Sequence, residues 1–144
     1  FMKIYLAAQF SRKEEMCGYA DALRAIGHEV TSRWLGQHDE LPYEELTAAG
    51  CKRCAEHDVT DVKASDCVIS FMEPVGIPNT SRGGRHVEFG LALALEKRLY
   101  LVGTPENVFH WYDGVIYFPV WEDCLIHYKR MAETPSRRLK RSAL

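Results

Sequence analysis

One carboxylate, Glu88, stands at the start of an apolar helix, directly after a loop rich in positive charge. The segment 81–95 reads SRGGRHVEFGLALAL. A helix N-terminus carries unpaired N–H groups and partial positive charge, which stabilise an ionised carboxylate. Such a carboxylate is suited to act as a nucleophile. The alternative is an ordinary helix-capping glutamate on a solvated first turn.

A second carboxylate is needed if Glu88 takes part in glycoside-type chemistry. The candidates are Asp58, Asp61 and Asp66, all near the end of a long predicted helix. The spacing from Asp58 to Asp66 corresponds to about 12 Å along a helix axis. Because this helix runs antiparallel to the strand that follows it, Asp58 is expected near the catalytic end of the strands and Asp66 at the opposite end. Geometry therefore favours Asp58, with a surface helix aspartate as the alternative.

The elements that must position these acids alternate between strands and helices. A capping box of Ser11 and Glu14 predicts a helix that ends at Gly27. Apolar runs predict five strands, and periodic segments predict a long helix over 42–65 (interrupted near Gly50), a helix around Glu88 and another over 120–132. The strands fall at 2–8, 28–34, 66–72, 99–102 and 115–118. This pattern indicates an α/β fold with a doubly wound, five-stranded parallel sheet of order 2-1-3-4-5, as in flavodoxin- or Rossmann-like domains.

In that strand order a crevice lies between the first and third strands, at their carboxyl ends. The loops 9–12 and 73–84 open there, which brings together Ser11, Arg12, Arg82, Arg85 and Glu88. The helix start at Ser11 and the neighbouring arginine indicate a cradle for phosphate or carboxylate. Neither a dinucleotide fingerprint nor a P-loop is present. A bound nucleotide is therefore expected to be a mononucleotide, with chemistry at its sugar or base.

Length and composition restrict the class of protein. The 144 residues predict one domain, and the net charge of −2 argues against binding to nucleic-acid polymers. No apolar run approaches the roughly 20 residues of a membrane span. The odd number of cysteines, 5, predicts reduced thiols and a cytoplasmic protein. The pair Cys51 and Cys54 lacks a second pair of ligands, so no metal site is expected.

Three stretches resemble the nucleoside 2-deoxyribosyltransferase superfamily: KIYLAA at 3–8, Asp58 with SD at 65–66, and GGRHVEFG at 83–90. Within it, the chain is most similar to nucleoside 5′-monophosphate N-glycosidases, over about residues 2–123. The resemblance implies a retaining reaction without a cofactor, in which Glu88 attacks C1′ of the sugar and forms a covalent glycosyl-enzyme. Asp58 would assist departure of the base, or bind the substrate and steer Glu88.

The resemblance also implies where the substrate binds. Phosphate contacts are expected from Ser11 and Arg12 and from Ser81 or Arg82. The pocket for the base or sugar is expected to be lined by Tyr5 and Phe10. Family members commonly complete the site at a homodimer interface, and the segment 106–110 is the candidate lid. The implied substrate-binding residues are Tyr5, Phe10, Ser11, Arg12, Ser81, Arg82, Gly84, Arg85, Asn107 and His110.

Two departures from the family bear on the substrate. Gln9 stands where many relatives have proline, so the first turn is expected to be reshaped. The chain ends in a basic tail instead of the aromatic residue and carboxylate of classical deoxyribosyltransferases. Together with Arg12, Arg82 and Arg85, this favours a phosphorylated substrate, because the planar guanidinium matches phosphate oxygens.

The sequence therefore predicts a nucleoside 5′-monophosphate N-glycosidase domain over 1–133 and a flexible basic tail over 134–144. Its partners would be a small nucleotide or nucleoside and a second copy of the chain, with no membrane. Two alternatives stay open. One is a deoxyribosyltransferase that exchanges bases on free deoxynucleosides, and the other is a non-catalytic nucleotide-sensing module.

Overall fold

Five parallel strands form the sheet predicted from the sequence. The computed structural model describes residues 1–36, 41–78 and 82–142, with 134–142 described by their backbone alone. The strands are β1 (Lys3–Ala7), β2 (Glu29–Val30), β3 (Cys67–Phe71), β4 (Arg98–Val102) and β5 (Ile116–Phe118). All four strand pairings are parallel, and the order is β2-β1-β3-β4-β5. The doubly wound α/β prediction is thus confirmed.

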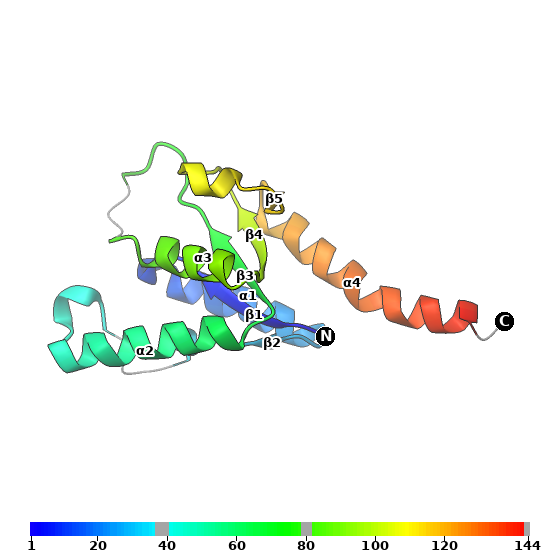
Figure 1. Ribbon diagram of the computed structural model, residues 1–144, viewed down its shortest axis with the longest axis horizontal. Helices are drawn as coiled ribbons and strands as arrows, with labels where there is room; N and C mark the ends of the chain where they lie inside the picture. Colours follow the sequence, from blue (N-terminus) through cyan, green and yellow to red (C-terminus); the bar gives the residue numbers. More distant parts are fainter. Residues whose placement is uncertain (37–40, 79–81, 143–144) are drawn as a thin grey trace.

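Helices cover both faces of this sheet (Figure 1). The helices α2 (Ala48–Ala64) and α3 (Gly84–Ala94) pack against each other and against β1, and α1 (Lys13–Ala25) contacts α4 (Trp121–Ser142). Strands covered on both sides are expected to be apolar throughout. Accordingly, every residue of β3 is buried, as are the last four residues of β1. Within the described part of the chain, no helix combines the length and apolarity needed to cross a membrane.

The turn after β1 differs from the predicted capping box. A short 3-10 helix, η1 (Phe10–Arg12), precedes α1, so Arg12 occupies the N-cap position and makes no capping bond through its side chain. The Ser11 hydroxyl donates instead to Gln9 Oε1 at 3.2 Å. The capping-box prediction is therefore wrong, because η1 places Ser11 one residue too early to cap α1.

The predicted end of α1 is confirmed. Gly27 adopts a left-handed φ of 95°. Its N–H donates to the Arg24 carbonyl at 3.0 Å, and the His28 N–H donates to the Leu23 carbonyl at 3.1 Å. These two bonds form a Schellman motif, which favours glycine at this position.

The second strand is shorter than the predicted 28–34. After β2 the chain turns into the 3-10 helix η2 (Arg33–Leu35). The Ser32 hydroxyl accepts from the Leu6 N–H at 2.7 Å, and Trp34 Nε1 donates to the Leu6 carbonyl at 2.9 Å. The backbone groups of Leu6 are thus bonded by two side chains instead of by a neighbouring strand. The chain can therefore leave the sheet after β2, and Trp34 lies over the end of β1.

The long helical region is interrupted earlier than predicted. The 3-10 helix η3 (Tyr43–Glu45) ends at Leu46, which is extended, and α2 then begins after Thr47. The Thr47 side chain caps α2 by accepting from the Gly50 N–H at 3.1 Å. Gly50 lies inside α2, so the threonine and not the glycine marks the break.

Two differences lie in the second half of the chain. The segment expected as a lid contains a 3-10 helix, η4 (Val108–Trp111), which the sequence did not predict. Helix α4 continues to Ser142, beyond the predicted end at Ala132. The flexibility of residues 134–144 stays a prediction.

Candidate active site

A cavity of about 1200 Å³ lies beyond the carboxyl end of β1 and beside the start of α3. Its walls come from the turn after β1, the first turns of α1, the segments η2 and η3, and the facing sides of α2 and α3. The turn after β1 and residues 82 and 84 border the cavity, as predicted from the strand order, but no residue of β3 or of 73–78 is among the described lining residues. The described residues that line it are Tyr5, Ala8, Gln9, Phe10, Ser11, Lys13, Glu14, Cys17, Trp34, Leu41, Pro42, Tyr43, Glu44, Leu46, Cys54, Asp58, Arg82, Gly84, Arg85 and Glu88.

The structure brings the two predicted catalytic acids into this one cavity. Asp58 extends from α2 and Glu88 from α3, and both are half-buried. One oxygen of each carboxylate is screened from solvent. Both carboxylates also act on the phenol of Tyr5 on β1. Burial, followed by the negative charges of Glu88 and Asp58, raises the pKa of Tyr5 well above its usual value of 10. The phenol therefore stays protonated and able to donate.

The other two candidate acids are held elsewhere. Asp61 is buried and accepts from the Arg33 backbone N–H at 2.9 Å and from Arg33 Nε at 2.8 Å. Asp66 accepts from the Lys3 N–H at 2.8 Å, at the amino end of β1. Only the first of the three predicted acids, Asp58, is among the described residues that line the cavity.

The start of α3 brings its backbone close to the nucleophile candidate. Gly83 precedes the helix with a left-handed φ of 89°, a conformation that L side chains rarely adopt. A Cβ placed on Gly84 would lie 3.9 Å from Glu88 Oε1. The Glu88 carboxylate is thus directed back toward the first turn of α3.

Two aromatic rings also line the cavity. The rings of Phe10 and Trp34 are 6.5 Å apart and tilted by 39°. Lys13 Nζ lies 5.7 Å from the centroid of the Phe10 ring. Phe10 is 36% exposed, so its ring is accessible from the cavity. Such a surface can stack a planar base, while the lysine contributes positive charge.

Arg82 lines the cavity but is already engaged. Its Nε and Nη2 both donate to Glu44 Oε1, at 3.3 and 3.2 Å. Its guanidinium carbon lies 4.7 Å from the centroid of the Tyr43 ring. Arg82 thus connects the loop before α3 with η3.

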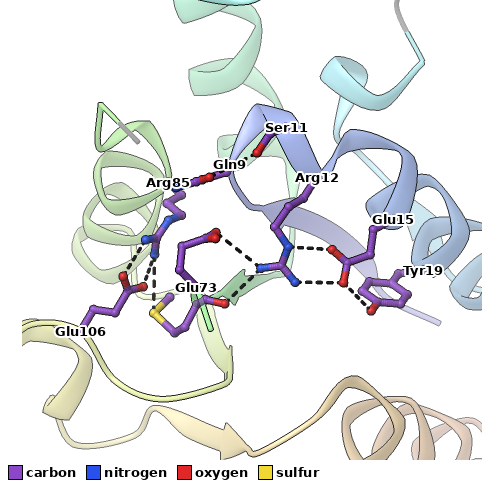
Figure 2. A network of polar contacts seen from close by, with 9 residues as sticks. Gln9, Ser11, Arg12, Glu15, Tyr19, Glu73, Arg85 and Glu106 are labelled. Atoms are coloured by element: carbon purple, nitrogen blue, oxygen red, sulfur yellow. Dashed lines mark hydrogen bonds and ion pairs between the residues drawn. The ribbon is translucent and has the colours of Figure 1, made fainter. Parts of the chain in front are cut away.

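The guanidinium of Arg85 uses its Nη1 and Nη2 donors within the protein. Its side chain is fully buried and forms a bidentate pair with Glu106, at 2.5 and 2.8 Å. Burial raises the pKa of Glu106 and the Arg85 guanidinium lowers it, and the net result is a lowered pKa. Figure 2 shows this pair, and Arg85 Nη1 also donates to the sulfur of Met72 at 3.6 Å. Although Arg85 borders the cavity, its charge is neutralised within the protein.

Arg12 is not among the described residues that line the cavity, contrary to the predicted convergence at one rim. Its Nε and Nη2 donate to the Glu15 carboxylate at 2.6 and 3.0 Å, and Nη1 donates to the Met72 carbonyl at 3.0 Å (Figure 2). Glu73 Oε1 lies 3.6 Å from the same guanidinium. Arg12 borders a second cavity, of about 350 Å³.

The two residues predicted in the lid are also not brought to the described lining of the cavity. Asn107 caps η4 by accepting from the Phe109 N–H at 3.0 Å. His110 is fully buried, accepts from the Glu106 N–H at 2.9 Å and packs edge-on against Phe89. Burial lowers the pKa of His110 to about 4, so the ring is neutral. The predicted phosphate contact Ser81 lies outside the described residues.

Several lining residues were missed in the sequence. Trp34 stands at the end of the predicted second strand, and that position already implied the carboxyl edge of the sheet. Tyr43 and Glu44 follow Pro42 in a segment predicted as helix, and no local signal places them near Arg82.

The described part of the chain contains no group of three or more His, Cys, Asp or Glu residues able to hold a metal ion.

Comparisons with known proteins agree with this architecture. No family model matches the sequence, and no curated protein matches it significantly. Among solved structures, a 2-deoxyribosyltransferase from Bacillus psychrosaccharolyticus matches with a TM-score of 0.66 and 24% identity, over 85% of this chain and 90% of that one. A Clostridium botulinum CMP N-glycosidase matches with a TM-score of 0.53 and 22% identity, over 81% and 87%. A conserved protein from Enterococcus faecalis V583 matches with a TM-score of 0.61 and 16% identity, over 91% and 99%. The chain therefore has the fold of a 2-deoxyribosyltransferase and of a CMP N-glycosidase.

Proposed function

We propose that the protein cleaves the N-glycosidic bond of a nucleoside 5′-monophosphate by a retaining mechanism. The observation that carries this proposal is the convergence of Asp58 and Glu88 on one cavity, which the protonated phenol of Tyr5 also lines. Retaining glycosidases use two carboxylates in this way, one as nucleophile and one as acid and base. The shared fold with a CMP N-glycosidase supports the substrate class.

In the first step a Glu88 oxygen bonds to C1′ while the bond from C1′ to the base breaks. The electron pair of that bond leaves on the base nitrogen, which takes a proton from Asp58. In the second step a water oxygen bonds to C1′, the Glu88 carboxylate leaves with its electron pair, and Asp58 recovers a proton from the water. The products are the free base and the sugar 5-phosphate. The Glu88 anion stabilises the positive charge that develops on the sugar.

Phosphate recognition is proposed from a smaller set of residues than the sequence predicted. Ser11, Lys13 and Arg82 line the cavity and offer a hydroxyl, an ammonium and a guanidinium. Arg12 is left out because it does not line the cavity, and Arg85 because its buried guanidinium is paired with Glu106, whereas the pair of Arg82 with Glu44 is exposed. Gly84, at the start of α3, adds a backbone amide to this cradle.

The loss of two of the three expected arginines favours a second candidate, base exchange on free deoxynucleosides. In that reaction a second base, instead of water, accepts the sugar from Glu88. The shared fold with a 2-deoxyribosyltransferase supports this alternative. An assay with one nucleoside and a different free base would distinguish the two, since only the transferase forms a new nucleoside.

The test of the proposal is chromatographic assay of nucleosides and their 5′-monophosphates. Glu88→Gln should lose at least about 1000-fold in kcat, because the nucleophile is removed. Asp58→Asn should lose about 100-fold or more, as expected for removal of a general acid. Glu56→Gln is the matched control, since Glu56 is an exposed acid on the same helix as Asp58. Full activity of Glu88→Gln would refute the proposal.

Mass spectrometry of the quenched enzyme provides a second readout. A mass increase equal to the sugar phosphate less one water is expected on the peptide containing Glu88 during turnover. Binding without any cleavage by the wild-type protein would instead support the nucleotide-sensing alternative.

A further inference from the structure

One contact in the wall of the cavity has no role in the proposed reaction. It joins Arg82 to Glu44 and to Tyr43. All three residues line the cavity, and they come from two segments far apart in the sequence. The guanidinium of Arg82 lies over the Tyr43 ring at 4.7 Å and makes its two hydrogen bonds to a single oxygen of Glu44. A fork of two parallel bonds to two oxygens, the strongest arrangement for this pair, is not formed.

A carboxylate and a phosphate compete for the same face of a guanidinium, because both present oxygens at the spacing of its N–H groups. Both side chains of the pair are 64% exposed. An ion pair in such a setting is weak. Glu44 can therefore be displaced by a ligand, while the Tyr43 ring keeps the guanidinium in position through a cation–π contact.

We infer that Glu44 is a specificity-determining residue, which occupies Arg82 in the free protein and is displaced by the phosphate of the substrate. This inference rests on the proposed function, because it assigns the phosphate to Arg82. A phosphorylated ligand must break the Glu44 contact before it binds, whereas a neutral nucleoside leaves the contact intact. Glu44 thus weakens the binding of phosphorylated substrates and leaves the binding of neutral ones unchanged, so it reduces the difference in affinity between the two.

The test is calorimetric binding of ribose 5-phosphate and of ribose to the full chain, since neither sugar requires turnover or a particular base. Glu44→Gln should lower the Kd of ribose 5-phosphate about two- to five-fold, the range expected for loss of an exposed ion pair. The Kd of ribose should not change. Glu45→Gln is the matched control, because Glu45 is exposed and lies in the same 3-10 helix.

A double variant separates displacement from simple removal of negative charge. Arg82→Gln should raise the Kd of ribose 5-phosphate, and Glu44→Gln should then have no further effect in the Arg82→Gln background. A gain that persists without Arg82, or an unchanged Kd in Glu44→Gln, would overturn the inference. This binding test does not depend on catalysis. Absence of N-glycosidic cleavage would therefore refute the proposed function, while the effect of Glu44 on phosphate binding could still be measured.

Discussion

The buried phenol of Tyr5, at the centre of β1, interacts electrostatically with the carboxylate of Glu88 on α3, and burial together with that negative charge raises the pKa of the phenol. Tyr5 is fully buried in the core of the sheet, so its ring is fixed on all sides. A rigid strand thereby places a protonated hydroxyl in the cavity that Glu88 also lines. Positioning of this kind keeps a nucleophile in a productive geometry.

Replacement of Tyr5 by phenylalanine removes this hydroxyl and keeps the ring. A hydrogen bond that the hydroxyl donates to a charged carboxylate during the reaction would contribute about 1.5–3 kcal/mol. We therefore expect kcat/KM of Tyr5→Phe to fall about 10- to 100-fold, in steady-state assays of the proposed reaction. Tyr100→Phe is the control, since Tyr100 is buried in β4 away from the cavity. Equal losses in both variants would indicate a general effect on the core instead.

Substitution at Gly84 tests whether the substrate approaches the start of α3. An added Cβ meets only ordinary contacts, the nearest being Glu88 Oε1 at 3.9 Å. The free energy of unfolding of Gly84→Ala should therefore stay equal or rise, by at most about 1 kcal/mol. Its KM should rise if the sugar phosphate lies against the Gly84 amide. The free energy of unfolding of Gly83→Ala should instead fall, because the φ of 89° at Gly83 is strained for alanine. Chemical denaturation and kinetics on both variants give the comparison.

The buried pair of Arg85 and Glu106 should dominate the stability of the region around α3. Removal of one partner leaves a buried charge without compensation, which costs about 3–5 kcal/mol. Glu106→Gln should therefore lower the free energy of unfolding by several kcal/mol, at the lower end because Glu106 is 22% exposed. The double variant Arg85→Met/Glu106→Gln should recover most of this loss in urea unfolding. A double variant less stable than both single ones would contradict this prediction.

His110 should make stability depend on pH. Its pKa is about 4 in the folded protein, because burial disfavours the charged ring, against about 6.5 when unfolded. Between these values the unfolded chain binds more protons, so the free energy of unfolding should fall as the pH falls from about 6.5 to about 4. Burial also lowers the pKa of His28, His86 and His127, which adds to this slope. His110→Asn should show a shallower slope in unfolding measured across this range. An unchanged slope would mean that folding does not lower the pKa of His110.

The surface around η4 should mediate the predicted homodimer. Four large apolar side chains are 60–78% exposed there: Val108, Phe109, Trp111 and Tyr112. Contiguous apolar surface of this kind marks interaction sites. Trp111→Glu should shift the protein toward monomer in analytical ultracentrifugation, whereas Ile126→Glu, at an exposed position on α4, should not. A wild-type protein that is monomeric at high concentration would refute the homodimer.

Much of the fold was predictable because its signals are local. The buried runs of β1 and β3 are apolar on both faces, and Gly27 ends α1 with the left-handed conformation that glycine favours. The second strand was predicted too long because side chains from elsewhere replaced it as the backbone partner of Leu6. The contacts of Ser32 and Trp34 with Leu6 shorten the second strand, and no periodicity in the sequence records them.

The sequence by itself determined the strand order, and with it the edge of the sheet at which Glu88 and Asp58 meet. This was possible because parallel strands joined by helices allow few arrangements, and because the spacing along α2 places Asp58 near that edge. Tertiary structure decided the role of each arginine. Arg12, Arg82 and Arg85 look alike in the sequence, yet each meets a different carboxylate: Glu15, Glu44 or Glu106. Whether a guanidinium is available to a ligand depends on which acid the folded chain brings within reach, and two of these three acids lie far away in the sequence.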